Sequence, residues 1–137
     1  KIPVAGAVVV TTPQDIALLD ARRAVKMFEK VGINTLGTIE NMSTHVCSSC
    51  GHEEAIFGEG GAEQMCKDFG VALLGSLPLD MRIRCQSDVG EPVVVSQSEG
   101  SIAGAYRAAA EQLVQTLDQQ PKDFSNAFGK INVQSLK

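Results

Sequence analysis

The feature that most constrains the fold is a nearly uninterrupted apolar run at residues 4–11 (VAGAVVVT), followed at once by a helix-start signal. Such a run, rich in β-branched residues and without alternation, is typical of a strand covered on both faces in a parallel sheet. Thr12 is suited to an N-cap, Pro13 to the first helical position, and Asp15 to the positive end of the helix. We therefore expect a strand over residues 4–11 and a helix from Thr12 to about Val31.

The same alternation of strand and helix recurs along the chain. Further strands are predicted at residues 35–40 and 72–77, and helices at residues 62–69, 81–87 and 101–117. This order implies right-handed βαβ crossovers, and hence the α/β class with a parallel sheet against which helices pack. We predict one domain over residues 1–118. The polar, aperiodic stretch at residues 119–137 is predicted to be a loosely held tail.

Charge and hydropathy narrow the functional classes. The net charge of -4, without a Lys/Arg-rich run, argues against nucleic acid as a partner, because phosphate backbones require a concentrated basic face. We expect no membrane association, since neither an apolar run of about 18 residues nor a signal-peptide pattern is present. The cytoplasm is therefore the expected compartment. The start Lys-Ile-Pro-Val, without Met, is expected of a piece of a longer chain.

Polar and chemically unusual residues follow each predicted strand. Asn41 follows the second strand, and Pro78 and Asp80 follow the third. Ligands in such sheets bind at the carboxyl ends of the strands, so this edge can form an adenine or ribose pocket. Simple helix capping and loop closure remain an alternative. The pattern G-x-x-x-x-G-K-[ST] is absent, and residues 57–63 (FGEGGAE) predict a hinge or a close backbone approach rather than a phosphate site.

The cysteines divide into one pair and two single residues. Cys47 and Cys50 form a Cys-x-x-Cys pair, which can bind one metal centre from a single turn of backbone. Two such pairs supply the four sulfurs that zinc or a [4Fe-4S] cluster prefers, but this chain has one. Cys66 and Cys85 are interpreted as small buried hydrophobic residues.

The residues leave four interpretations of the pair open. A thioredoxin-like redox pair normally stands at a helix start, which the sequence does not predict here. A mononuclear zinc site can include His45 and His52, although four ligands within eight residues would strain a tetrahedral centre. An exposed loop with ordinary thiols is the third interpretation. In the fourth, a second copy related by a two-fold axis supplies the other two cysteines.

Several segments together resemble the second half of the Mrp/ApbC-type ATPases, the iron-sulfur carriers of the MinD-like branch of P-loop NTPases. The segments, in order from about Val4 to Leu117, are TTPQDIALLDARR, IENMSTHVCSSCG, IFGEGGAE, LPLDMRIR and GEPVVV. The resemblance implies a partial MinD-like P-loop NTPase fold, the C-terminal half, which lacks the phosphate-loop half.

The resemblance also implies a function and its cofactors. It implies a cytoplasmic homodimer that holds a labile [4Fe-4S] cluster between subunits through Cys47 and Cys50, and transfers it to apo iron-sulfur proteins. It implies ATP with Mg²⁺ in the full-length protein. Zinc is a possible substitute metal at the same pair.

The adenine side of the nucleotide site carries over onto four positions. Asn41, Pro78 and Asp80 match the base-contacting positions, and Leu79 is expected to add a backbone contact. No catalytic residue carries over, because the phosphate loop and the switch aspartates belong to the half that is not matched. The segment alone is therefore expected not to hydrolyse ATP.

Two other functions remain open alternatives. One is a non-enzymatic zinc-binding interaction module. The other, a MinD-like positioning ATPase without metal, leaves the cysteines unexplained. Loss of the central phosphate-loop strand is expected to expose an apolar strand edge, so we also expect self-association.

Overall fold

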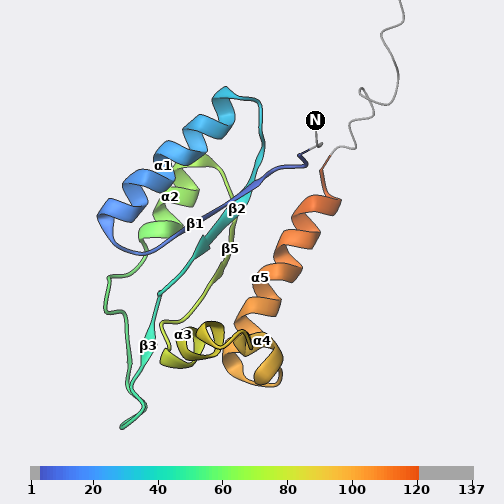
Figure 1. Cartoon of the computed structure of the whole chain (residues 1–137). Helices are drawn as coiled ribbons and strands as arrows, with labels where there is room; N and C mark the ends of the chain where they lie inside the picture. Colours follow the sequence, from blue (N-terminus) through green and yellow to red (C-terminus); the bar gives the residue numbers. More distant parts are fainter. Residues whose placement is uncertain (1–3, 121–137) are drawn as a thin grey trace, which may run out of the picture.

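The computed structural model describes residues 4–120 and contains a parallel three-stranded sheet in the order β1-β2-β5. The strands are β1 (Ala7–Thr11), β2 (Thr35–Glu40), β3 (His45–Val46), β4 (Glu53–Glu54) and β5 (Leu73–Ser76). The helices are α1 (Asp15–Lys30), α2 (Gly61–Phe69), α3 (Met81–Asp88), α4 (Val93–Ser96) and α5 (Ser101–Asp118). Helices α1 and α2 lie on one face of the sheet and α5 lies on the other (Figure 1). The predicted α/β class with a parallel sheet is confirmed.

The strand register brings the carboxyl ends of the three strands to one edge. Thr11 pairs with Glu40, which in turn pairs with Ser76. The ladder continues one step further, because the Asn41 N–H donates to the Thr11 carbonyl at 2.7 Å and the Leu77 N–H donates to the Glu40 carbonyl at 2.7 Å. The segments that follow the strands therefore emerge side by side, as the sequence predicted.

Helix α1 begins later than the sequence predicted. Its first residue is Asp15, and the N-cap is Gln14 in an extended conformation without a side-chain cap. The Thr12 hydroxyl donates to the Gln14 side chain instead, so the predictions of Thr12 as N-cap and Pro13 as first helical residue are wrong. The Pro13 carbonyl lies close to Gly61, where an added Cβ would come within 3.2 Å of it.

The Gly-rich segment before α2 makes a close approach to α1. Gly60 has a φ of 74°, and a Cβ added at Gly61 would lie 2.4 Å from a methyl carbon of Leu18. The buried Glu40 carboxylate accepts a hydrogen bond from the Ala62 N–H at 3.2 Å. A carboxylate of this chain thus occupies the start of α2, where an anion would otherwise bind. The predicted close backbone approach is confirmed.

The main core lies between β1 and the two helices on its covered face. It consists of Val9, Leu18, Ala21, Val25, Ala62, Met65 and Cys66. Cys66 is 4% exposed, which confirms its interpretation as a small buried hydrophobic residue, and burial raises the pKa of its thiol. Cys85 lies on α3, which has no buried residue, and is exposed. The same interpretation is therefore wrong for Cys85.

Strand β1 is covered on one face only within residues 4–120. Val9 faces the core, whereas the neighbouring Val10 is 61% exposed. Helix α5 packs on β5 and β2, and β1 lies beyond it at the end of the strand order. The prediction that both faces of this strand are covered is therefore wrong for the described residues. The strand is also shorter than predicted, because it begins at Ala7.

A short hairpin projects beyond the carboxyl edge of the sheet. Strands β3 and β4 pair antiparallel, His45 with Glu54 and Val46 with Glu53, where the sequence predicted only a loop. The short helix α4 was likewise not predicted. None of the helices between residues 4 and 120 has the length and hydropathy that crossing a bilayer requires. Residues 121–137 of the predicted tail lie outside the described residues.

Candidate metal and nucleotide-base site

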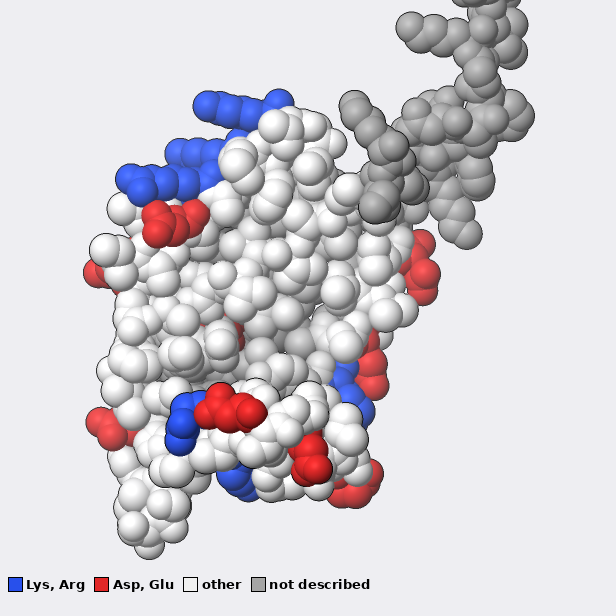
Figure 2. Space-filling model, in the orientation of Figure 1, with Lys and Arg blue, Asp and Glu red and all other residues white. Residues whose placement is uncertain are grey.

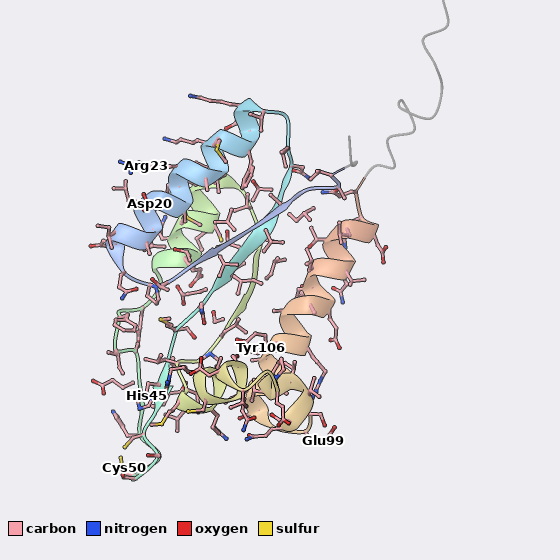
Figure 3. All side chains as sticks on the ribbon, in the orientation of Figure 1. Asp20, Arg23, His45, Cys50, Glu99 and Tyr106 are labelled. Carbon is pink, nitrogen blue, oxygen red and sulfur yellow. The ribbon has the colours of Figure 1, made fainter. Side chains whose placement is uncertain are left out.

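The turn between β3 and β4 brings the two paired cysteines together at the end of the hairpin. The Cys47 N–H donates to the His52 carbonyl at 2.9 Å, and the Gly51 N–H donates to the Cys47 carbonyl at 2.8 Å. Gly51 has a φ of 71°, a conformation that favours glycine. Cys50 lies at the tip, away from the sheet (Figure 3). This turn therefore presents both sulfurs from one short stretch of backbone.

The environment of Cys47 favours its thiolate. The pKa of Cys47 is lowered, chiefly by the nearby backbone N–H groups of Ser49 and Cys50. The Cys50 thiol lowers it further, and His45 contributes least. Because the thiolate is the form of cysteine that binds metal, the turn suits two ligands of a thiolate centre.

The two flanking histidines do not complete a metal site with the cysteines. No group of three or more His, Cys, Asp or Glu side chains that could hold a metal ion occurs in the described part of the chain. His45 Nδ1 lies 3.0 Å from the Leu79 carbonyl, so the ring is engaged with the segment after β5. The mononuclear zinc arrangement is therefore not formed by residues 4–120. The hairpin setting also differs from the helix start of a thioredoxin-like pair.

A cavity of about 250 Å³ lies beside the hairpin at the carboxyl edge of the sheet. All four residues predicted to contact a nucleotide line it, and the sequence did not identify the others. The lining residues are Asn41, Met42, Pro78, Leu79, Asp80, Ile83, Arg84, Ser87 and Asp88. The structure thus brings the predicted base-side residues together, while their contact with a nucleotide stays a prediction.

The orientation of the Asn41 side chain is fixed by its neighbour. Its Oδ1 accepts a hydrogen bond from the Met42 N–H at 2.9 Å, and Met42 has a φ of 58°. A left-handed conformation costs a non-glycine residue roughly 1 kcal/mol, so the rest of the fold holds this turn. Because Oδ1 is engaged, the side-chain amide N–H₂ of Asn41 is the group offered to a ligand.

The polar groups of Leu79 and Asp80 already have partners within the chain. The Leu79 N–H donates to the Thr44 carbonyl at 2.7 Å, and its carbonyl meets His45. The Asp80 carboxylate caps α3 by accepting from the Arg82 N–H and also binds the Arg82 guanidinium. That guanidinium is the main cause of the lowered pKa of Asp80. The prediction of a polar contact with a base therefore rests chiefly on the Asn41 side chain.

A second cavity, of about 430 Å³, lies between the edge strand β1 and helix α1 and shares Asn41 with the first. Its walls are mostly apolar and come from β1 and α1. The lining residues are Val9, Val10, Thr11, Thr12, Ala17, Asp20, Ala21, Ala24 and Asn41. The sequence did not predict this cavity, because it depends on how α1 packs against the edge strand.

Known relatives match most of this chain but only part of their own length. The family model described as "ParA: NUBPL iron-transfer P-loop NTPase" matches residues 1–114. The iron-sulfur cluster carrier protein of Pseudomonas fragi is 54% identical over 110 residues, which cover 80% of this chain and 38% of that protein. The resemblance inferred from the sequence is confirmed.

Solved structures agree on the fold. The nucleotide-binding protein of Archaeoglobus fulgidus, in complex with ADP, is 32% identical with a TM-score of 0.56, over 64% of this chain and 36% of that one. The cell division ATPase MinD of Pyrococcus furiosus is 26% identical with a TM-score of 0.64, over 81% of this chain and 43% of that one. This chain therefore spans less than half the length of each of these relatives and has a MinD-like arrangement. It belongs to the ParA family, as a member of its NUBPL iron-transfer P-loop NTPase group.

Proposed function

We propose that this chain is the C-terminal half of an ATP-dependent iron-sulfur cluster carrier. Cys47 and Cys50 bind a labile [4Fe-4S] cluster shared with a second copy of the chain, and the carrier delivers it to apo-proteins. The observation that carries the proposal is the cysteine turn itself, which the Cys47 N–H to His52 carbonyl and Gly51 N–H to Cys47 carbonyl bonds hold at the end of the hairpin. The likeness to iron-sulfur cluster carrier proteins supports the choice of metal.

We infer that two chains share one cluster from the number of thiolate ligands that the cluster needs. A [4Fe-4S] cluster takes four thiolates, and the turn supplies two. A two-fold axis through the hairpin tips supplies the other two by symmetry. The tip suits this contact because residues 47–52 (CSSCGH) contain no Lys, Arg, Asp or Glu, so identical tips can meet without like-charge repulsion. Figure 2 shows this projecting lobe free of charged side chains on the visible face.

The exposed position of the turn accounts for transfer. Cys50 is exposed and Cys47 is partly exposed, so thiolates of an acceptor protein can reach the bound cluster. In each exchange an Fe–S bond to an acceptor thiolate forms and the Fe–S bond to Cys47 or Cys50 breaks, with no electron transferred. The N–H groups of Ser49 and Cys50 stabilise the departing Cys47 thiolate, and this favours release.

The cavity beside the hairpin is the proposed binding site for the base of the nucleotide. We propose that Asn41, Pro78, Leu79 and Asp80 hold the base of ATP, with the Asn41 amide donating to an acceptor on the base edge and Pro78 giving an apolar wall. The phosphates and Mg²⁺ are assigned to the phosphate-loop half of the longer protein. No catalytic residue is assigned to this chain.

Anaerobic reconstitution with iron and sulfide tests the proposal. The chain is compared with a Cys47→Ser, Cys50→Ser variant and with Cys85→Ser, a control that removes an exposed single cysteine. The wild type and the control are expected to bind about two irons per chain with broad visible absorbance, and the double variant to bind none. Equal iron in all three would contradict the proposal. Colourless wild type with stoichiometric zinc would support the zinc-binding module instead.

A further inference from the structure

The hairpin that carries the cysteines is attached by consecutive hydrogen bonds to the base-side segment, the residues 77–80 that follow β5. The Ser43 N–H donates to the Leu77 carbonyl at 2.9 Å, and the Leu79 N–H donates to the Thr44 carbonyl at 2.7 Å. His45 then forms a parallel bridge with Leu79. The strand that leads to the cysteines therefore runs beside the segment that lines the base cavity.

Two side chains add to this backbone attachment. The Ser43 hydroxyl donates to the Leu77 carbonyl at 3.0 Å. His45 Nδ1 lies 3.0 Å from the Leu79 carbonyl, and because a carbonyl only accepts, Nδ1 must carry the proton and donate it. Figure 3 places His45 at the root of the hairpin, between the Cys50 tip and the sheet.

The hairpin needs such an anchor. Strands β3 and β4 have two residues each, and an isolated two-stranded hairpin is at best marginally stable in water. Val46, Glu53 and Glu54 are all exposed, so these residues give the hairpin little buried area. The position of the cysteine turn therefore depends on what holds its root.

We propose that His45 is a positioning residue that fixes the cysteine turn to residues 78–80, so that a displacement of the base-side segment is passed to the metal-binding thiolates. The proposal rests on the proposed function for the identity of the two ligands. If residues 78–80 have two positions and a base binds more tightly to one of them, base binding changes the affinity of the cysteines for metal. By linkage, metal binding then changes the affinity for the base by the same factor.

The chain offers a matched control for this role. His52 lies on the opposite side of the turn, is exposed, and bonds Cys47 through its backbone carbonyl. A side-chain substitution at His52 therefore leaves that bond in place. His45→Asn is the conservative variant, because the asparagine Nδ2 can donate from nearly the same place as the histidine Nδ1.

The first test measures amide hydrogen exchange by NMR in the metal-free chain. We expect His45→Ala to speed exchange at the Cys47 and Gly51 amides by about tenfold, the effect of losing one anchoring hydrogen bond. His45→Asn should restore slow exchange, and His52→Ala should match the wild type. Equal exchange in His45→Ala and His52→Ala, or no rescue by asparagine, would overturn the proposal.

The second test uses Co²⁺ as a probe and reads its thiolate charge-transfer absorption. The affinity for Co²⁺ is expected to fall in Asp80→Ala, which releases the start of α3 next to Leu79, and in His45→Ala. If His45 carries the effect, the double variant should lose no more affinity than His45→Ala alone. Additive losses would overturn the proposal. Neither test uses iron or nucleotide, so a failed reconstitution would refute the cluster without deciding the role of His45.

Discussion

At the scale of the residue, Asp80 shows how one carboxylate can serve both the local fold and the site. Its oxygens accept hydrogen bonds from the backbone N–H and guanidinium of Arg82, at 2.7 to 2.9 Å. The same contacts cap α3 and hold the residue at the wall of the base cavity. The charge of Asp80 therefore contributes to the stability of the helix start.

We predict that Asp80→Asn lowers the free energy of unfolding at pH 7 by about 0.5–1 kcal/mol, because asparagine still caps the helix but loses the ion pair. The folded-state pKa of Asp80 is below the unfolded value of about 3.9. The charge therefore stabilises fully above the unfolded pKa, and its contribution is lost as the pH falls through the folded pKa. Urea unfolding between pH 2 and pH 7 measures the difference.

The control for this prediction is Asp88→Asn, since Asp88 forms an exposed ion pair with Arg84 at 3.2 Å. Its effect should be smaller than that of Asp80→Asn at pH 7. A difference between wild type and Asp80→Asn that stays constant down to the lowest pH would show that the charge of Asp80 does not stabilise the fold.

The residues also show what a sequence can and cannot predict about a site. The Cys47 and Cys50 pair was predictable, because Cys-x-x-Cys spacing brings two sulfurs into one turn in almost any fold. The burial of the two single cysteines was not predictable, since it depends on how the whole helix packs. Cys66 lies on the buried face of α2, whereas Cys85 lies on a helix without buried residues. The anchoring role of His45 required knowledge of a strand bridge.

At the scale of the element, the contact between β5 and α5 depends on a missing side chain. A Cβ added at Gly75 would lie 2.9 Å from the Cβ of Ala109. Helix α5 can therefore approach the strand only because residue 75 is glycine. Gly104 provides the contrast on the same helix, because an added Cβ there would meet nothing within 4 Å.

We predict that Gly75→Ala destabilises the chain by about 1–3 kcal/mol, because α5 must move away from β5. Gly104→Ala should instead be neutral or stabilising by up to about 1 kcal/mol, since alanine restricts the unfolded helix segment. Chemical unfolding of both variants measures the two effects. A loss of stability in Gly104→Ala as large as that in Gly75→Ala would contradict this account of the contact.

Element existence was more predictable than element ends. The strand at residues 35–40 was predicted with its observed bounds, because its apolar run is flanked by clear turn residues. The predicted start of α1 was wrong because the Thr12 hydroxyl bonds the Gln14 side chain and the backbone is still extended at Gln14. The hairpin was missed because its strands have two residues each, too few for a period to appear.

At the scale of the whole molecule, the described chain has an open side along β1. Val10 is largely exposed there, and an apolar cavity runs between β1 and α1. An edge strand with unpaired backbone groups templates pairing with another chain. The sequence resemblance led to the same expectation, because it implied that the phosphate-loop half is missing from this chain.

We predict that the isolated chain self-associates through this side at high concentration. Val10→Lys should reduce the association, because lysine on an edge strand discourages strand pairing. Val114→Lys, at an exposed position on α5, is the control and should leave the association unchanged. Light scattering over a concentration series measures both. A wild type that stays monomeric throughout would contradict the prediction.

The overall arrangement could be predicted because alternation of strand and helix leaves few topologies. The parallel sheet and the shared carboxyl edge followed from that order. The coverage of each strand did not, since it depends on where α5 crosses the sheet. The grouping of Asn41 with residues 78–80 was implied by the resemblance, and the cavity that joins them required the structure.

Native mass spectrometry of the anaerobically reconstituted chain tests the central claim, a cluster shared by two copies, most directly. It counts chains, irons and sulfides in one intact species. The account predicts two chains with one [4Fe-4S] cluster, and only metal-free species for the Cys47→Ser, Cys50→Ser variant. A complete cluster on a single chain, or a dimer whose cluster survives the double substitution, would contradict it.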